Sequence, residues 1–234
     1  MKYLKIILLG FSICFLAIYF CADFLYNPKY VIYIKPFIIP LFLCYGHFEN
    51  KKPLTIKFYL FALLFYIGDI IFLISDTIMI YLCSGLFFYF LSYLALVNLI
   101  NPLSGKYKLK NIFGGYTLFI IILNSFFLSS ILYLIFQSVN SNYLVFIIIL
   151  NTLAAVLLSV SAVFYLSTKY NKKSTFYFFG ALLILMSDIF AALEKYYMAD
   201  FTLNLFDRIL HLLGFYFVYR FCIESKEPTK IVEP

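Results

Sequence analysis

The sequence has few charged residues for its length. Only 12% of its 234 residues are charged, whereas 65% are hydrophobic and the mean hydropathy is +0.98. An ordinary soluble domain is roughly 25% charged and about 45–50% apolar. A compact soluble fold of this composition would have too few polar residues to cover its surface. The composition therefore excludes a soluble enzyme, a disordered chain and a collagen-like fold, and it favours a membrane protein with several spans.

The chain also lacks the cysteine and histidine patterns of metal sites and disulfide frameworks. Its five cysteines are scattered through apolar segments, and no two form a C-x-x-C pair. There are only two histidines and no His-rich cluster, so we expect no metal ion and no cofactor. The motifs G-x-S-x-G and H-E-x-x-H and a phosphate-binding glycine loop are missing as well. Any hydrolytic chemistry is therefore expected to depend on carboxylates, with His211 or Lys35 as a further candidate.

Long apolar runs separated by short polar gaps predict an all-α, polytopic bundle with about eight membrane-spanning helices. No gap is long enough to hold a separate domain. Residues 1–223 are therefore predicted to form a single transmembrane domain, and residues 224–234 a short charged tail. No small-residue cleavage site follows the first run, so we expect a true span there rather than a signal peptide. The predicted helices lie at 5–24, 30–48, 56–75, 78–101, 112–137, 143–167, 175–196 and 203–223.

The basic residues alternate between the two sides of the predicted bundle. Fourteen of the 18 lie in gaps or tails on one side, and the exceptions are Lys29, Lys35, Lys195 and Arg208. Because cytoplasmic loops are enriched in Lys and Arg, both termini are predicted to be cytoplasmic. The net charge of +7 is explained by this topology and by the anionic membrane surface, so membrane lipids are the expected partners rather than nucleic acid. The predicted location is a bacterial cytoplasmic membrane, and the sequence indicates no oligomeric state.

Several ionisable residues lie inside the predicted spans. Such a group costs several kcal/mol if it faces lipid, so each one is a functional-site hypothesis. With a rise of about 1.5 Å per residue, they all lie roughly 6–12 Å below the outer face. Groups from four helices at one depth predict a shared polar pocket that opens to the outer leaflet. The residues are Lys35, Asp69, Asp188, Asp207, Arg208 and His211.

Each of these residues also has a purely structural explanation. Lys35 could extend to the outer interface, and Asp207 could form an interfacial ion pair with Arg208. His211 could be a buried residue with satisfied hydrogen bonds. Asp69 and Asp188 are harder to explain in this way, because a carboxylate is too short to reach the interface. Their structural alternative is a buried pair with Lys35 or Arg208.

Four short motifs occur in a fixed order along the chain. They are Lys35-Pro36, Gly68-Asp69, Gly85-Leu86 and the segment from Gly180 to Ser187-Asp188. Their order and spacing resemble the YhhN family, the lysoplasmalogenases, over residues 30–223. The resemblance implies an eight-span membrane enzyme that hydrolyses the vinyl-ether bond of a lysoplasmalogen. It carries over to Lys35, Asp69, Ser187 and Asp188.

Two positions depart from the family pattern. The family usually has a histidine eight residues after the glycine of the fourth helix, where this chain has Tyr93. The last helix of the family usually carries a tyrosine followed by Gln or His, whereas the nearest match here is His211 followed by Phe215. The resemblance therefore extends only weakly to Tyr93 and His211, and it does not extend to Phe215.

The predicted function is an integral-membrane hydrolase that converts a lysoplasmalogen to a fatty aldehyde and a glycerophospho head group. Cleavage of a vinyl ether begins with protonation at carbon, which requires a general acid. A second carboxylate can stabilise the cation or activate water. Asp69 and Asp188 are therefore the predicted catalytic pair. The predicted residues for binding the lysophospholipid substrate are Lys35, Tyr93, Ser187, Arg208 and His211.

Two alternatives to the hydrolase remain open. The first is a non-enzymatic carrier of lipids or small solutes, in which the buried charges line a transport path. Helices 56–75 and 175–196 share an apolar-small-Asp-Ile pattern and run in the same direction, as expected for the parallel repeats of some transporters. The second alternative is a catalytically inactive relative, for which the departures at Tyr93 and Phe215 are the reason.

Overall fold

The computed structural model describes five long helices and some shorter pieces of the chain. All the regular structure in the described residues is α-helical, and five helices are long and apolar enough to cross a membrane. They are α3 (Ile56–Ile74), α4 (Met79–Ile100), α7 (Asn142–Thr168), α8 (Lys172–Tyr196) and α9 (Phe201–Ile223). The described residues are 36–44, 54–74, 78–100, 141–198 and 200–224, with the single positions 10, 14, 118, 119, 122, 126, 129 and 133.

The prediction of an all-helical membrane bundle is confirmed for this part of the chain. Each long helix begins and ends within three residues of a predicted span. Residues 36–44 are also helical and lie inside the predicted span 30–48. The predicted spans 5–24 and 112–137 lie mainly outside the described residues, as does the rest of 30–48.

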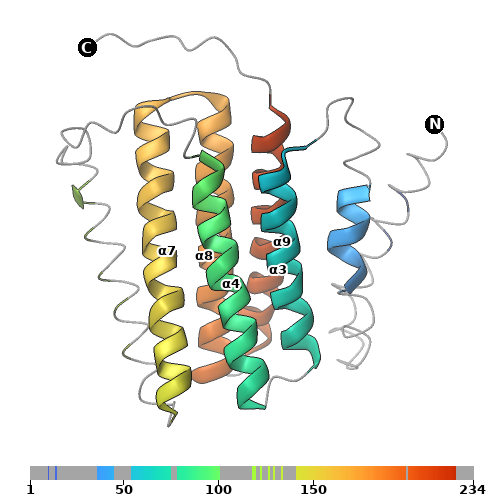
Figure 1. Ribbon diagram of the computed structural model, residues 1–234, viewed down its shortest axis with the longest axis vertical. Helices are drawn as coiled ribbons and strands as arrows, with labels where there is room; N and C mark the ends of the chain where they lie inside the picture. The colour runs from blue at the N-terminus through green and yellow to red at the C-terminus, as the bar shows by residue number, and fades with distance from the viewer. Residues whose placement is uncertain are drawn as a thin grey trace.

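The five long helices stand side by side (Figure 1). Helices α4, α7 and α9 run in one direction, and α3 and α8 run in the opposite direction. Along the chain α3 packs on α4, α4 on α7, α7 on α8, and α8 on α9. We call the end where α3 is followed by α4, and α8 by α9, the hairpin end. We call the opposite end the charged end, because five basic residues of the described chain lie at or near it. These are Lys57, Lys169, Lys172, Lys173 and Arg220.

Aromatic rings join α9 to α3 in the centre of the bundle. Phe58, Phe61 and Phe65 recur every three or four residues, so they lie on one face of α3, and each is completely buried. The ring of Phe215 on α9 lies 6.0 Å from the ring of Phe61 and 6.2 Å from that of Phe65, nearly parallel to both. We call these four phenylalanines the aromatic column. Phe42, in the short helix 36–44, packs edge-on against Phe215 from the other side at 5.5 Å.

A pair of glycines brings α8 and α9 into backbone contact. A β-carbon added at Gly180 would lie 3.0 Å from the backbone nitrogen of Val218. A β-carbon added at Gly214 would lie 2.9 Å from the backbone nitrogen of Ile184. Small residues at such positions let membrane helices approach closely. The contact lies one helical turn along α9 from His211 and two turns along α8 from Ser187.

Side chains at the two ends of the bundle cap the helices. At the hairpin end, Asp200 accepts a hydrogen bond from the backbone N–H of Thr202 at 2.6 Å and so caps the start of α9. Hydrogen bonds from Thr202 also lower the pKa of the exposed Asp200 carboxyl. At the charged end, the side chain of Asn171 accepts from Ser174 N–H at 2.8 Å, and Ser174 Oγ accepts from Asn171 N–H at 3.1 Å. This reciprocal arrangement is a capping box at the start of α8.

Replacing Asn171 with alanine is expected to lower the free energy of unfolding by about 1 kcal/mol, because the first turn of α8 loses its cap. The measurement is chemical or thermal unfolding of the purified protein in detergent. Asn171→Ser keeps a capping oxygen and should lose much less. Equal losses for the two variants would contradict a capping role.

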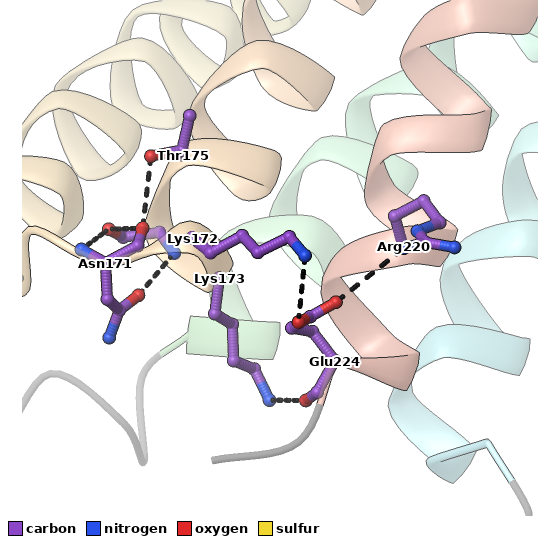
Figure 2. Close-up of polar contacts among 7 residues, drawn as sticks. Asn171, Lys172, Lys173, Thr175, Arg220 and Glu224 are labelled. Carbon is purple, nitrogen blue, oxygen red and sulfur yellow. Dashed lines mark hydrogen bonds and ion pairs between the residues drawn. The ribbon is translucent and has the colours of Figure 1, made fainter. Parts of the chain in front are cut away.

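Three basic side chains converge on Glu224 and tie the start of α8 to the end of α9 (Figure 2). Lys172 Nζ lies 3.6 Å from Glu224 Oε1, and an Arg220 nitrogen lies 3.8 Å from Oε2. Lys173 donates a hydrogen bond to the Glu224 backbone carbonyl at 3.1 Å. Lys172 and Arg220 also lie over the ring of Phe176. Partly exposed ion pairs of this kind contribute little to stability, but they connect the two helix ends.

Candidate functional site

A continuous chain of polar side chains crosses the bundle between α3, α4, α8 and α9. Tyr89 on α4 donates a hydrogen bond to Asp69 Oδ1 on α3 at 2.8 Å, and His211 Nε2 on α9 lies 3.2 Å from Asp69 Oδ2. On its other side, His211 Nδ1 lies 3.3 Å from Ser187 Oγ on α8, and Ser187 Oγ donates to Asp207 Oδ1 at 2.5 Å. We call these five residues the polar chain.

Most of the polar chain is shielded from solvent. The exposed fractions are 3% for Asp69, 0% for Ser187 and 8% for His211, and Asp207 is half-buried. Asp207 lies one helical turn closer than His211 to the hairpin end of α9, since residues four apart share a face. The more accessible end of the polar chain therefore faces the hairpin end of the bundle.

Two features of the local packing orient His211. Phe65 lies one turn before Asp69 on α3, and its ring stacks on the imidazole with centroids 4.5 Å apart and planes 19° apart. The backbone contact at Gly214 holds α9 against α8 one turn away. The imidazole plane is thus fixed between the two helices, with one nitrogen directed at Asp69 and the other at Ser187.

The number of hydrogens available to the polar chain limits how its contacts can be satisfied. Three contacts link Asp207, Ser187, His211 and Asp69 in sequence, and each contact needs one hydrogen between its two heavy atoms. The serine hydroxyl supplies one hydrogen, a neutral imidazole supplies one, and ionised carboxylates supply none. If all three contacts are hydrogen bonds, the polar chain holds one proton more than a neutral imidazole and two carboxylates would carry. The arrangement is chemically suited to donate a proton.

Asp188, the second predicted catalytic residue, lies beside the polar chain. It directly follows Ser187 on α8 and is half-buried. Its carboxylate interacts electrostatically with the Tyr89 hydroxyl, as do the carboxylates of Asp69 and Asp207. Carboxylates from three helices thus act electrostatically on one phenol group, and both predicted catalytic aspartates are among them.

The remaining predicted site residues have different surroundings. Arg208 is buried, with 8% exposure, and follows Asp207 on α9. Tyr93 is also buried and lies one turn beyond Tyr89 toward the charged end, but its hydroxyl has no hydrogen-bond partner among the described residues. The predicted phosphate ligand Lys35 lies outside the described residues.

Two members of the polar chain were absent from the predicted site. Tyr89 is one of 22 tyrosines, and nothing in its sequence neighbourhood distinguishes it. Asp207 was identified as an ionisable group in a span, but its link to Ser187 depends on how α8 meets α9. The sequence does contain one indication that they belong together. Asp207 and His211 are four residues apart, so both lie on one face of α9.

Replacing Tyr89 with phenylalanine should remove one hydrogen bond to Asp69 while keeping the ring packing against Phe65. The expected loss in free energy of unfolding is about 1 kcal/mol. Unfolding in detergent measures this loss. The matched control is Tyr143→Phe on α7, where the tyrosine is 82% exposed and stability should not change. An equal effect at both positions would contradict the buried hydrogen bond.

Comparisons with known proteins do not identify a family for this chain. No family model, no curated protein and no solved structure matches this chain. Within the described part of the chain, no group of three or more His, Cys, Asp or Glu residues is arranged to hold a metal ion. The functional interpretation therefore depends on the chemistry of the polar chain and on the motif resemblance.

Proposed function

We propose that this protein is an integral-membrane hydrolase that cleaves the vinyl-ether bond of a lysoplasmalogen. The products would be a fatty aldehyde and a glycerophospho head group. The observation that carries this proposal is the polar chain, in which His211 contacts both Asp69 and Ser187 inside an apolar helix bundle. The resemblance of the motif order to the YhhN family supports the same reaction.

The chemistry needs a proton donor that is protected from water. A proton is added to the vinyl carbon remote from the ether oxygen, which gives an oxocarbenium ion. Water then adds to the cationic carbon, and the resulting hemiacetal collapses to an aldehyde and an alcohol. The contact between Asp69 and His211 supplies the proton, and Asp188 is the carboxylate that stabilises the cation or accepts the proton from water. One water molecule is consumed and no net proton is used.

The proposed substrate orientation follows from the distribution of charge. The single hydrocarbon chain lies among the apolar helices. Its phosphate binds Arg208 and Lys35, since guanidinium is suited to bidentate contact with phosphate. Tyr93 lies beside the reacting bond. We further propose eight spans with cytoplasmic termini in a bacterial cytoplasmic membrane, which places the hairpin end at the outer leaflet.

A carrier that moves a solute together with protons is the second candidate, because chains of Asp and His side chains also occur in transporters. A carrier needs a polar path that continues to the opposite side. Toward the charged end, His211 is followed by the aromatic column, and the Tyr93 hydroxyl has no hydrogen-bond partner among the described residues. These two observations favour an enzyme site that is closed on that side.

The direct test is aldehyde formation by the purified full-length protein. A lysoplasmalogen should yield aldehyde, whereas the 1-alkyl analogue, which differs only in lacking the double bond, should yield none. A folded protein that produces no aldehyde from lysoplasmalogen would refute the hydrolase. Proton-coupled uptake of lysolipid into proteoliposomes by the same preparation would then establish the carrier.

A further inference from the structure

We infer that Ser187 and Asp207 hold His211 in one tautomer, with its hydrogen on Nδ1, and so place the transferable proton at the contact between His211 Nε2 and Asp69. Ser187 is a positioning residue in this arrangement, because it acts through His211. The tautomer follows from the geometry alone, whereas its catalytic consequence rests on the proposed hydrolase function.

The first step concerns the single hydrogen of the Ser187 hydroxyl. Two groups compete to accept it, namely Asp207 Oδ1 at 2.5 Å and His211 Nδ1 at 3.3 Å. A hydrogen bond from a hydroxyl to a carboxylate is shorter and roughly twice as strong as one between neutral groups. The hydroxyl hydrogen is therefore committed to Asp207. Because Ser187 is completely buried, no solvent contact competes with this arrangement.

The second step concerns the imidazole. With its hydrogen directed at Asp207, Ser187 Oγ presents lone pairs to His211, so the Nδ1 atom must carry the hydrogen of that contact. A neutral imidazole has no second hydrogen for Nε2. The 3.2 Å contact between Nε2 and Asp69 Oδ2 therefore contains the additional proton, either as an imidazolium beside a carboxylate or as a neutral imidazole beside a carboxylic acid. The Tyr89 hydroxyl donates to the other oxygen of Asp69 and does not compete for this proton.

The surrounding charged groups and the stacking are consistent with this assignment. Asp188 on α8, Arg208 on α9 and Tyr89 on α4 are the other titratable or charged groups of the described site. Ser187 lies at the Nδ1 side of the ring and Asp69 at the Nε2 side. Stacking on Phe65 fixes the plane of the His211 ring. Ser187 therefore affects which ring nitrogen carries the hydrogen, not the orientation of the ring.

The test uses nitrogen NMR of ¹⁵N-histidine-labelled protein in lipid nanodiscs. The chain has two histidines, so His47→Gln leaves the signals of His211 alone. In this background, Nδ1 should remain protonated throughout a pH titration, and only the Nε2 signal should change. A neutral His211 with its hydrogen on Nε2 and none on Nδ1 would overturn the inference.

Two substitutions should reverse the tautomer by different routes. Ser187→Ala removes the acceptor for Nδ1–H, so the neutral imidazole should carry its hydrogen on Nε2 and donate it to Asp69. Asp207→Asn retains the serine, but the amide can donate to Ser187 Oγ, which frees the hydroxyl hydrogen for Nδ1. Asp207→Asn also keeps the test valid if Ser187→Ala fails to fold. An unchanged Nδ1–H tautomer in either folded variant would refute the role of the pair.

The matched control is Ser92→Ala. Ser92 is completely buried on α4, like Ser187, but its hydroxyl donates only to the Tyr89 carbonyl within its own helix at 2.8 Å. This variant should retain the wild-type nitrogen spectrum, and a reversed tautomer in it would show a non-specific effect and overturn the assignment to Ser187.

An activity measurement connects the tautomer to the proposed reaction. Ser187→Ala should lower kcat for aldehyde formation by at least about tenfold with little change in KM, because the proton is no longer held at the contact with Asp69. If the wild type forms no aldehyde, the proposed hydrolase fails, while the nitrogen spectra still decide the tautomer. A Ser187→Ala variant with a reversed tautomer and an unchanged kcat would support the tautomer assignment but refute the catalytic role of Ser187 and Asp207.

Discussion

Asp69→Asn is expected to lower the rate of aldehyde formation by about 10²-fold or more, the range attributed to a general acid. Asparagine has nearly the same shape as aspartate, and its amide can still accept a hydrogen bond from Tyr89. It cannot hold the additional proton at the contact with His211 Nε2. The measurement is steady-state turnover of lysoplasmalogen by the purified variant, with the recovery of folded protein determined in parallel.

A matched control separates this effect from a general response to an Asp→Asn change. Asp200 caps the start of α9 outside the polar chain, and asparagine is an equally good cap, so Asp200→Asn should leave turnover unchanged. Asp188→Asn should lower turnover about as much as Asp69→Asn if both carboxylates take part in the chemistry. Wild-type turnover by a folded Asp69→Asn variant would contradict the assignment of Asp69 as the acid. If Asp69 is only a buried structural partner, the variant should instead lose about 3–5 kcal/mol of stability.

Gly214→Ala should destabilise the protein by about 2–3 kcal/mol, because the added methyl group would lie 2.9 Å from the backbone nitrogen of Ile184. A backbone atom cannot move aside as the end of a flexible side chain can, so α8 and α9 must separate. The separation would also lengthen the contact between Ser187 and His211, which lies about one turn away. Both the free energy of unfolding and the turnover should therefore fall.

Gly10→Ala provides the corresponding glycine control, because no atom of the described residues lies within 4 Å of a β-carbon added there. Alanine favours the helix over glycine, so the stability of this variant should be unchanged or slightly higher. Unaltered stability in Gly214→Ala would show that the two helices can accommodate a β-carbon and would contradict the close backbone contact.

The sequence predicted the described helices well because membrane spans obey a simple rule. Apolar runs of sufficient length must be helical so that their backbone groups are hydrogen-bonded within the segment. The ends of α3, α4, α7, α8 and α9 therefore follow from hydropathy and turn residues to within three positions.

The contacts between the site residues could not be predicted from hydropathy. Asp69 and His211 are 142 residues apart in the chain, and Ser187 and His211 are 24 apart. Their contacts depend on which face of each helix meets its neighbour, and hydropathy gives little guidance when a helix is apolar on all sides. The cost of burying an ionisable group identified Asp69, Asp188 and His211 as candidates. Only the packing of α3 against α9 shows that Asp69 and His211 are in contact.

The aromatic column has a consequence for the energetics of the membrane. A buried group that binds protons is a potential leak in a membrane that maintains a proton gradient, since each charge that crosses dissipates about 2.3 kcal/mol per 100 mV. From Phe65 to Phe58 the column extends about 10 Å along α3, and neither these side chains nor that of Phe215 has an atom that can carry a proton. Along this path a proton taken up near Asp207 must return toward the hairpin end. The rings that position His211 thus also insulate it electrically from the opposite side.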